Sequence, residues 1–220
     1  IVFFDVVQPS NLAIHENLGA GSLAIEISAY GEKIITNCGG SEVGGKNPAY
    51  LKYSAAHSTI ILDNTNITEI KEGDFKKDFV KKVNFEKRDD DNLMLLSGTH
   101  NGYLTNFNKI CKRTLSINKK KELLIGEDTI ISTQSIIKKN VFHIRFHLMP
   151  EISTTITENK KNIIIKTKKN NIWMFKSNKE MILEKSIFVR NDIANETKQI
   201  VISGITSALN TKVEWSLEKI

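Results

Sequence analysis

The segment Phe142-His143-Ile144-Arg145-Phe146-His147-Leu148 decides the fold class of this chain. Apolar and polar residues alternate at each position, as in a β-strand, where successive side chains point to opposite faces. The four apolar side chains therefore share one face, and the two histidines and the arginine share the other. The polar face is either an ordinary sandwich surface or a surface that contacts polysaccharide. His143 and His147 would lie roughly 13 Å apart along the strand, too far to chelate one ion.

Strand-like segments separated by polar turns continue on both sides of this segment. We predict strands at residues 22–28, 33–36, 57–62, 79–86, 93–97, 109–117, 129–132, 141–148, 163–167, 172–175, 181–189, 199–202 and 213–217. No window of helical length keeps an apolar period of 3.6 residues, and lysine-rich turns at 119–121, 160–161 and 168–169 are typical of hairpin tips. Many short strands predict an all-β fold, an antiparallel multi-stranded β-sandwich over residues 1–220.

Composition limits the classes of partner. The 220 residues carry a net charge of +6, and all but four of the 31 basic residues are lysines. Proteins that read nucleic acids favour arginine, and no base-stacking motif is present, so we expect no nucleic-acid partner. The basic surface would attract an anionic polymer. The hydrophobic fraction of 40% is enough for a core.

Cys38 and Cys111 are the only cysteines, and their separation predicts neither a disulfide framework nor a thiolate zinc site. No apolar run reaches membrane-spanning length, so we expect no membrane span. The chain opens directly in the strand-like residues 1–4, without a signal peptide. We therefore expect it to be a domain of a longer protein.

A second informative segment is Ser54-Ala55-Ala56-His57-Ser58-Thr59-Ile60-Ile61-Leu62-Asp63. Small residues lead to the imidazole, and the β-branched residues after it predict a strand. A histidine at the entrance of a strand can be a metal ligand, a proton carrier or a hydrogen-bonded edge residue. The segment alone leaves these three roles open.

Taken in order, several motifs resemble the C-terminal β-sandwich domain of heparinase II/III-like polysaccharide lyases. They are Gly21-Ser22-Leu23-Ala24-Ile25-Glu26, Asn37-Cys38-Gly39, Ala55-Ala56-His57-Ser58-Thr59, His100-Asn101-Gly102-Tyr103, Arg113-Thr114-Leu115, Gly126-Glu127-Asp128, Arg145-Phe146-His147-Leu148-Met149-Pro150 and Gln199-Ile200-Val201-Ile202-Ser203-Gly204. The resemblance covers nearly the whole chain, and the order of the motifs is more specific than any one of them.

The resemblance implies cleavage of uronic-acid polysaccharides, heparin- or heparan-like or alginate-like, by β-elimination. That chemistry needs a base for the C5 proton, a group that neutralises the carboxylate, and an acid for the departing oxygen. In the family, much of this machinery lies on an N-terminal α/α-toroid, which we expect upstream of residue 1. The implied partners are an acidic polysaccharide and that toroid, and the implied location is the periplasm or cell envelope.

The resemblance also implies zinc as the candidate cofactor. The family's zinc ligands come from a His-x-His pair, an Asp before a Gly, and the His of the Ala-His element. Here His57 matches the last ligand, Asn37 replaces the Asp, and the pair falls near Leu18-Gly19-Ala20. His15 lies just upstream and is the other candidate. We therefore predict His15 and His57 as catalytic residues and His57 alone as a vestigial metal position.

Tyr50, Tyr53 and Asn37 are predicted to bind substrate, although the two tyrosines could instead pack over the end of a sheet. Trp173 and Trp215 could stack on sugar rings, but the apolar neighbours around Trp173 favour a place in the core. His100 precedes Asn101-Gly102, a strong turn signal, and is predicted to be a hairpin residue.

Two functions remain open. In the first, the domain completes the substrate cleft of a longer lyase, which the retention of His57 favours. In the second, it is a non-catalytic carbohydrate-binding or structural module with a decayed zinc site, which the loss of the His-x-His pair and the Asp favours.

Overall fold

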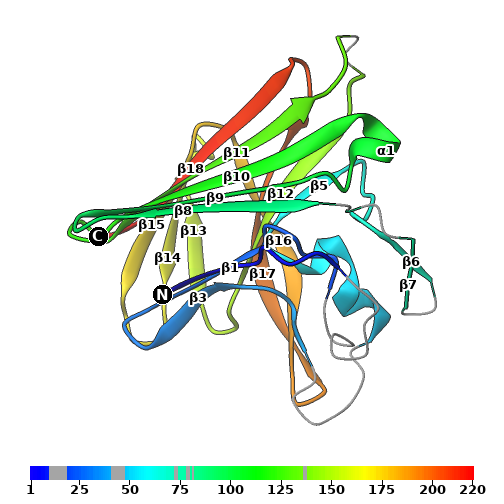
Figure 1. Cartoon of the computed structure of the whole chain (residues 1–220). Coiled ribbons are helices and arrows are strands. Elements are labelled where there is room, and N and C mark those ends of the chain that lie inside the picture. The colour runs from blue at the N-terminus through cyan, green and yellow to red at the C-terminus, as the bar shows by residue number, and fades with distance from the viewer. Residues whose placement is uncertain (10–18, 41–47, 72–73, 78–79, 81, 136–137) are drawn as a thin grey trace.

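The chain folds into two β-sheets packed face to face, shown by a computed structural model (Figure 1). The structure describes residues 1–9, 19–40, 48–71, 74–77, 80, 82–135 and 138–220. This arrangement confirms the predicted all-β sandwich. No helix in these residues is long and apolar enough to cross a membrane.

The first sheet has the order β1 (Val2–Phe4), β2 (Ile25–Ala29), β3 (Glu32–Thr36), β12 (Val141–Leu148), β17 (Ile193–Ile205), β16 (Met181–Arg190) and β4 (Gly39–Gly40), with β5 (Ile60–Leu62) also paired to β12. The second has the order β13 (Ser153–Ile156), β14 (Asn162–Lys166), β15 (Ile172–Ser177), β18 (Asn210–Lys219), β11 (Leu123–Ser132), β10 (Lys109–Asn118), β9 (Leu93–His100) and β8 (Val83–Asp89). A small separate hairpin pairs β6 (Glu69–Lys71) with β7 (Asp74–Lys77). Among the described strands, only the β16–β4 pair is parallel.

Strand β12 lies in the middle of the first sheet and has the predicted bounds. One of its edges pairs with β17 over most of its length. Its other edge is shared, because β5 pairs with the first half and β3 with the end. This sharing brings the segment that follows His57 against β12, and so places His57 beside the end of the strand that decides the fold class.

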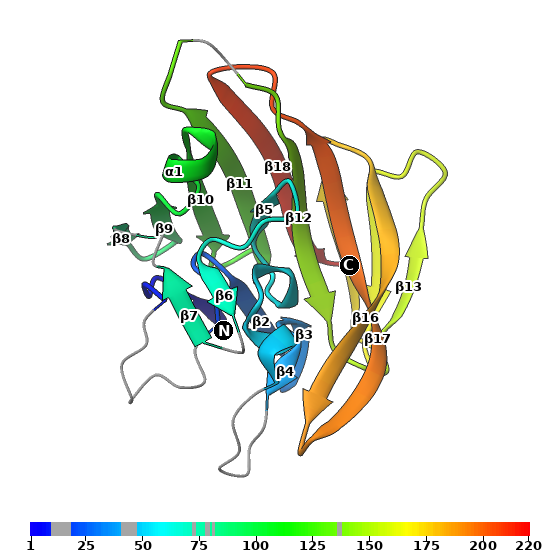
Figure 2. The ribbon, with the colours of Figure 1, turned by 90° about the vertical axis from the view of Figure 1, so that its right-hand side faces the viewer.

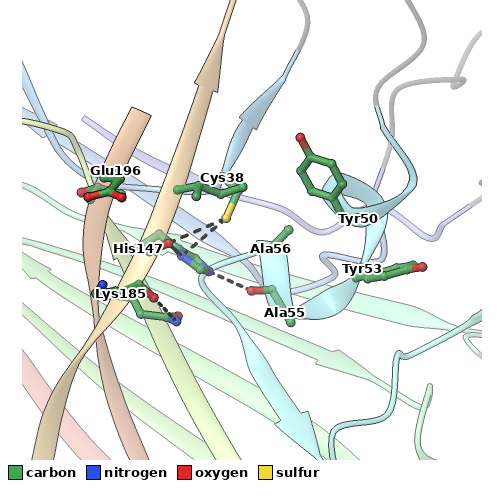
Figure 3. A pocket seen from close by; sticks show the side chains of 12 residues that line it. Cys38, Tyr50, Tyr53, Ala55, Ala56, His147, Lys185 and Glu196 are labelled. Atoms are coloured by element: carbon green, nitrogen blue, oxygen red, sulfur yellow. Dashed lines mark hydrogen bonds between the residues drawn. The ribbon is translucent and has the colours of Figure 1, made fainter. Parts of the chain in front are cut away.

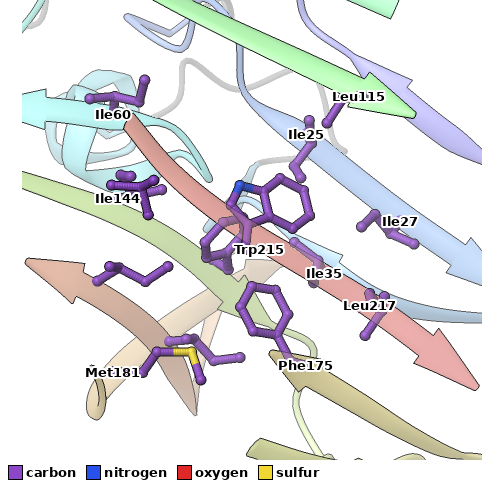
Figure 4. Packing of buried hydrophobic residues seen from close by; sticks show 14 of the residues in the cluster. Ile25, Ile27, Ile35, Ile60, Leu115, Ile144, Phe175, Met181, Trp215 and Leu217 are labelled. Carbon is purple, nitrogen blue, oxygen red and sulfur yellow. The ribbon is translucent and has the colours of Figure 1, made fainter. Parts of the chain in front are cut away.

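The core lies between the two sheets (Figure 4). Phe146 of β12 makes edge contacts with Phe175 and Trp215 of the second sheet, with ring centroids 4.9 and 4.8 Å apart. Trp173 and Trp215 are both buried, as predicted, so neither presents its ring as a sugar-stacking platform. The apolar face of β12 is therefore an inner face of the sandwich.

A buried ion pair links two neighbouring strands of the second sheet, Arg113 on β10 and Asp128 on β11. The Arg113 guanidinium donates to both carboxylate oxygens of Asp128, at 2.6 and 2.9 Å, and neither side chain is exposed. Its Nη1 also donates to the carbonyls of Leu23 and Ser58, and Trp215 Nε1 donates to Asp128. The pair thus joins the second sheet to the loop that follows His57.

Several strand boundaries differ from the predicted ones. The strand predicted at 57–62 begins at Ile60, so His57 precedes the strand by three residues. The strands predicted at 129–132 and 199–202 are longer, and β13 was missed. The apolar–polar alternation is lost in the sequence at Gly126-Glu127-Asp128 and over most of residues 193–198, yet pairing with a neighbouring strand supplies the backbone hydrogen bonds there whatever the side chains are. Residues 79 and 81 of the segment predicted at 79–86 lie outside the described residues, and β8 begins at Val83.

The connection after His100 is also longer than the predicted tight turn. β9 and β10 do form a hairpin, but the chain passes through the single helical turn α1 (Leu104–Phe107) before β10 starts. His100 is 1% exposed, and its Nδ1 accepts a hydrogen bond from the amide of Gly102. It is therefore a buried residue at the end of a strand, close to Tyr103.

Candidate functional site

Two short 3-10 helices lead into the candidate site. They are η2 (Ala49–Lys52) and η3 (Ser54–Ala56), and they place Tyr50 and Tyr53 with their rings partly exposed, at 45% and 39%. Small residues at 54–56 allow the second turn to pack closely against the sheet, since Ser54 is fully buried and its Oγ accepts from the amide of Ile67. His57 follows directly in an extended conformation.

The His57 side chain is closely packed and almost inaccessible to solvent. Its Nδ1 is 2.8 Å from the carbonyl oxygen of Tyr53, which can only accept, so Nδ1 carries the proton. The ring lies against Gly19 and Gly21: a Cβ on Gly19 would be 2.2 Å from Nε2, and one on Gly21 would be 2.4 Å from Cδ2. Burial lowers the pKa of His57 below its ordinary value. The imidazole is therefore held neutral, in one tautomer and in one orientation.

Both polar atoms of the Asn37 side chain are also held in hydrogen bonds within the domain. Its Oδ1 accepts a hydrogen bond from the amide of Ser58 at 2.8 Å, and its Nδ2 donates to Glu26 at 3.1 Å. Glu26 in turn pairs with Lys33. The structure brings His57, Asn37 and Tyr53 together, since Asn37 accepts from the amide of Ser58 and the His57 ring donates to the carbonyl of Tyr53. Each of these two hydrogen bonds joins a side chain to a backbone group, the carbonyl of Tyr53 or the amide of Ser58.

The residues here do not fit the zinc ion that the resemblance implied. Gly19 stands where the family has its histidine pair, and the His57 ring fills the space that a side chain on Gly19 would need. Asn37 uses its amide oxygen for a backbone hydrogen bond. The described residues contain no group of three or more His, Cys, Asp or Glu that could hold a metal. His15 lies outside the described residues, so its predicted catalytic role stays a prediction.

A hollow of about 440 Å³ lies beside these helices (Figure 3). One wall comes from η2, η3 and their connection, and the opposite wall comes from the β16–β17 hairpin. The lining residues are Cys38, Tyr50, Tyr53, Ala55, Ala56, His147, Lys185, Ser186, Ile187, Glu196, Thr197 and Gln199. Figure 2 shows this hairpin running past the rest of the sheet, beside β4. His57 and Asn37 are not among the lining residues; His57 directly follows the wall residues 53–56 in the chain.

The floor of the hollow is formed by the polar face of β12 and by Cys38. His147 is 2% exposed; its Nε2 lies 3.0 Å from the carbonyl oxygen of Ala55, and its Nδ1 lies 2.7 Å from Ser186 Oγ and 3.6 Å from Cys38 Sγ. Burial lowers the pKa of His147 to about 3 and raises that of Cys38 to about 11. Both groups are therefore uncharged at neutral pH.

The sequence left open whether the polar face of β12 is an ordinary sandwich surface or contacts polysaccharide. In the structure this face is not uniform, because His143 is partly exposed whereas His147 is buried. Cys38, Ser186 and Gln199 were not predicted as lining residues. The alternation of β12 did place His147 on the correct face. No sequence signal could show that residues 147 positions apart, such as Cys38 and Lys185, meet around one space.

Comparisons with known proteins identify the family. The model of the family described as heparinase II/III-like, C-terminal, matches residues 1–216. The crystal structure of the heparan sulfate lyase HepC from Pedobacter heparinus superposes with a TM-score of 0.76 at 15% identity, over 99% of this chain and 32% of that one. A heparinase III structure gives a TM-score of 0.68 at 15% identity, over 92% of this chain and 30% of that one. At these identities the likeness shows a shared fold.

A curated relative is FtsZ-localized protein C from Caulobacter vibrioides (strain NA1000 / CB15N), 24% identical over 234 residues. The alignment covers 99% of this chain and 40% of that protein, so the chain spans about two fifths of this relative's length. The family model, matching almost every residue, agrees with the resemblance seen in the ordered motifs. The chain belongs to the heparinase II/III-like C-terminal family.

Proposed function

We propose that this chain is the C-terminal domain of a polysaccharide lyase and that it completes the substrate cleft for a uronic-acid-containing polymer. The observation that carries the proposal is the hollow beside His57, with Tyr50 and Tyr53 exposed on its wall, in a chain of this family. Aromatic rings with one exposed face are suited to contact sugar rings. The solved relative HepC is a heparan sulfate lyase, which makes a heparan-like polymer the first substrate to try.

The described residues of the sandwich supply only part of the elimination chemistry. The reaction needs a base, a group that neutralises the carboxylate and a leaving-group acid together. His57 is neutral and buried, and its Nδ1–H donates a hydrogen bond to the backbone carbonyl of Tyr53. We therefore propose that an upstream α/α-toroid supplies the remaining groups, and that His57 shapes the wall of the cleft.

The test compares the 220-residue chain with the same chain preceded by its toroid. On heparan-like or alginate-like polymers, the longer protein should generate the absorbance of unsaturated uronate products and the shorter one should not. Tyr50→Ala and Tyr53→Ala should weaken polymer binding, measured by isothermal titration. The control is Tyr30→Ala, at a tyrosine of similar exposure in the turn between β2 and β3. Full activity of the 220-residue chain alone would show that the remaining catalytic groups do not come from an upstream toroid.

The second candidate function is a non-catalytic carbohydrate-binding or structural module. What favours it is the mismatch with the family's zinc ligands, namely Gly19 under the His57 ring and Asn37 bound to a backbone amide. This function predicts that the toroid-bearing protein binds the polymer and releases no unsaturated product.

Zinc titration is a separate prediction. We expect at most weak binding to the 220-residue chain in isothermal titration, and its loss in His57→Ala, because a zinc site needs at least three protein ligands. Tight stoichiometric binding that His15→Ala abolishes would overturn this expectation. The location proposed from the family, the periplasm or cell envelope, can be checked by fractionating cells that produce the whole protein.

A further inference from the structure

The floor of the hollow brings a thiol and an imidazole nitrogen together. Cys38 Sγ lies 3.6 Å from His147 Nδ1, and Ser186 Oγ lies 2.7 Å from the same nitrogen. All three residues line the hollow (Figure 3). They come from distant segments, namely the residue before β4, strand β12 and strand β16. The proposed lyase function uses none of these three groups.

The His147 imidazole presents a lone pair to this cluster. Its Nε2 lies 3.0 Å from the carbonyl oxygen of Ala55, which can only accept, so Nε2 carries the proton. Because burial lowers the pKa of His147 to about 3, the ring is neutral at physiological pH. Nδ1 therefore keeps the lone pair that a metal ion requires. The carbonyl of Ala55 fixes the tautomer and orientation of the ring, as backbone carbonyls do behind metal-bound histidines.

The Cys38 thiol is nearly buried, although the hollow that it lines also holds the exposed Tyr50 and Tyr53 and so meets solvent. Burial raises the pKa of Cys38 to about 11, and hydrogen bonds with the Ser186 hydroxyl and the Ile187 amide lower it in part. These two groups can stabilise a thiolate. A thiol with so high a pKa loses its proton near neutral pH only when another cation takes the proton's place.

Charge and ligand number select the class of cation. One thiolate and one neutral imidazole carry a single negative charge, so a monovalent ion forms a neutral complex and leaves no buried charge unpaired. The nearby Arg145 is already paired with Glu184 at 3.0 Å. A zinc ion would leave a net charge and needs at least three protein ligands, whereas no third His, Cys, Asp or Glu joins this pair among the described residues. Thiolate sulfur and imidazole nitrogen are suitable ligands for the soft ion Cu(I).

The two ligand atoms lie close to bridging distance. Bonds from a first-row metal ion to thiolate sulfur and imidazole nitrogen are about 2.3 and 2.0 Å long, so an ion in line between them needs a separation of about 4.3 Å. The observed separation is 3.6 Å. A bent arrangement, or a movement of the two atoms by roughly 0.7 Å, therefore completes the site. The Ser186 hydroxyl can then turn from Nδ1 toward Cys38 Sγ, from which it lies 4.0 Å away.

We propose that Cys38 Sγ and His147 Nδ1 form a two-ligand site for a monovalent soft metal ion of the Cu(I) class. On binding, one sulfur–metal and one nitrogen–metal bond form, and the thiol releases its proton to solvent, with no oxidation or reduction. The site goes beyond the proposed lyase function and does not depend on it. It is also separate from the zinc position that the family resemblance assigned to His57 and Asn37.

Anaerobic titration of the 220-residue chain with Cu(I), in competition with a chromophoric Cu(I) chelator, tests the site. We expect one equivalent to bind, with thiolate-to-Cu(I) charge-transfer absorbance in the ultraviolet, while zinc does not compete. Cys38→Ser should abolish this binding. Cys111→Ser is the matched control, because the chain has only two cysteines and Cys111 is fully buried in the core. Each variant keeps one thiol, and the control should bind as the unmodified chain does.

A second arm separates the two-ligand site from a thiol that binds alone. In excess glutathione, a competing monothiol, His147→Gln should weaken Cu(I) binding at least about tenfold, since loss of even an indirect partner of a metal ligand costs that much. His143→Gln, on the same strand and outside the hollow, should leave the affinity unchanged.

Imidazole nitrogen NMR of the unmodified chain gives a readout that does not depend on how a variant folds. Ag(I), a redox-stable substitute for Cu(I), should shift Nδ1 of His147 and leave the Nε2–H in place. Binding that survives in Cys38→Ser, an unshifted His147 Nδ1, an unchanged affinity in His147→Gln, or equally tight binding of zinc would each overturn the site.

Discussion

At the scale of single residues, glycine explains why His57 is a packed wall residue. The ring occupies space that opens only because positions 19 and 21 have no Cβ. The neighbouring hydrogen bond from Nδ1 to Tyr53 then fixes its orientation. A histidine ring packed against two glycines, with one nitrogen bonded to the backbone, supports the loop that carries Tyr53.

Gly21→Ala tests this packing. The new methyl would stand 2.4 Å from the His57 ring, so we expect the free energy of unfolding to fall by about 1–3 kcal/mol in urea denaturation. His57→Ala should cost stability on its own by leaving a cavity. In the double variant the methyl has room, so the combined loss should be smaller than the sum of the single losses. Strictly additive losses would mean that the ring and the glycine are not in contact.

His147 predicts a pH dependence. Its pKa is lowered by burial to about 3 in the folded chain, against an ordinary value of about 6.5 when unfolded. Between these values the unfolded chain binds a proton that the folded chain does not. The free energy of unfolding therefore falls as the pH falls from about 6.5 toward 3.

We expect His147→Gln to reduce the slope of this loss by about 1.4 kcal/mol per pH unit between pH 6 and 4, measured by urea denaturation at each pH. His143→Gln, on the same strand but only partly buried, should reduce the slope less. An unchanged slope in His147→Gln would show that this imidazole is already protonated in the folded chain.

At the scale of elements, β12 organises the first sheet because both of its edges are paired. Its outer face forms the floor of the hollow at His147, and its inner face packs on the second sheet through Phe146. The strand that was clearest in the sequence therefore serves both the core and the candidate site.

Ile144→Ala tests the contribution of the inner face. The side chain is fully buried, and its truncation should lower the free energy of unfolding by about 2–5 kcal/mol. Ile182→Ala on β16 of the same sheet removes the same atoms from a side chain that is 47% exposed, and should change stability by about 0.5 kcal/mol or less. Comparable losses in the two variants would contradict the assignment of faces.

At the scale of the whole molecule, the Arg113–Asp128 pair ties the second sheet to the loop around Ser58. The loop that carries His57 is thereby joined to strands that follow it by more than fifty residues. Removing one charge leaves the other buried without its counter-charge, which is far more costly than losing an exposed pair.

We expect Asp128→Asn to lower the free energy of unfolding by about 3–5 kcal/mol and to shift the NMR signals of residues 57–59. Lys212→Met breaks the neighbouring, more exposed pair between Lys212 of β18 and Glu127 of β11, and should cost about 1 kcal/mol or less. If the two substitutions had similar costs, the buried pair would not be what ties the second sheet to the loop around Ser58.

The sequence by itself determined what depends on local pattern and on motif order. Alternation at 141–148 predicted the central strand and its faces, because a strand's side-chain direction follows from its period alone. The ordered motifs predicted the family that the comparisons confirmed. The lysine-rich turns and the burial of both tryptophans were also predicted correctly.

Only the tertiary structure decided the candidate site. The hollow joins Cys38, η2–η3, His147 and the β16–β17 hairpin, whose positions depend on sheet pairing between distant segments. The neutral state of His147 likewise follows from burial, which no residue type specifies. Local sequence sets where a side chain points along its strand, whereas long-range pairing sets what it meets, and the chemistry of this site depends on what its side chains meet.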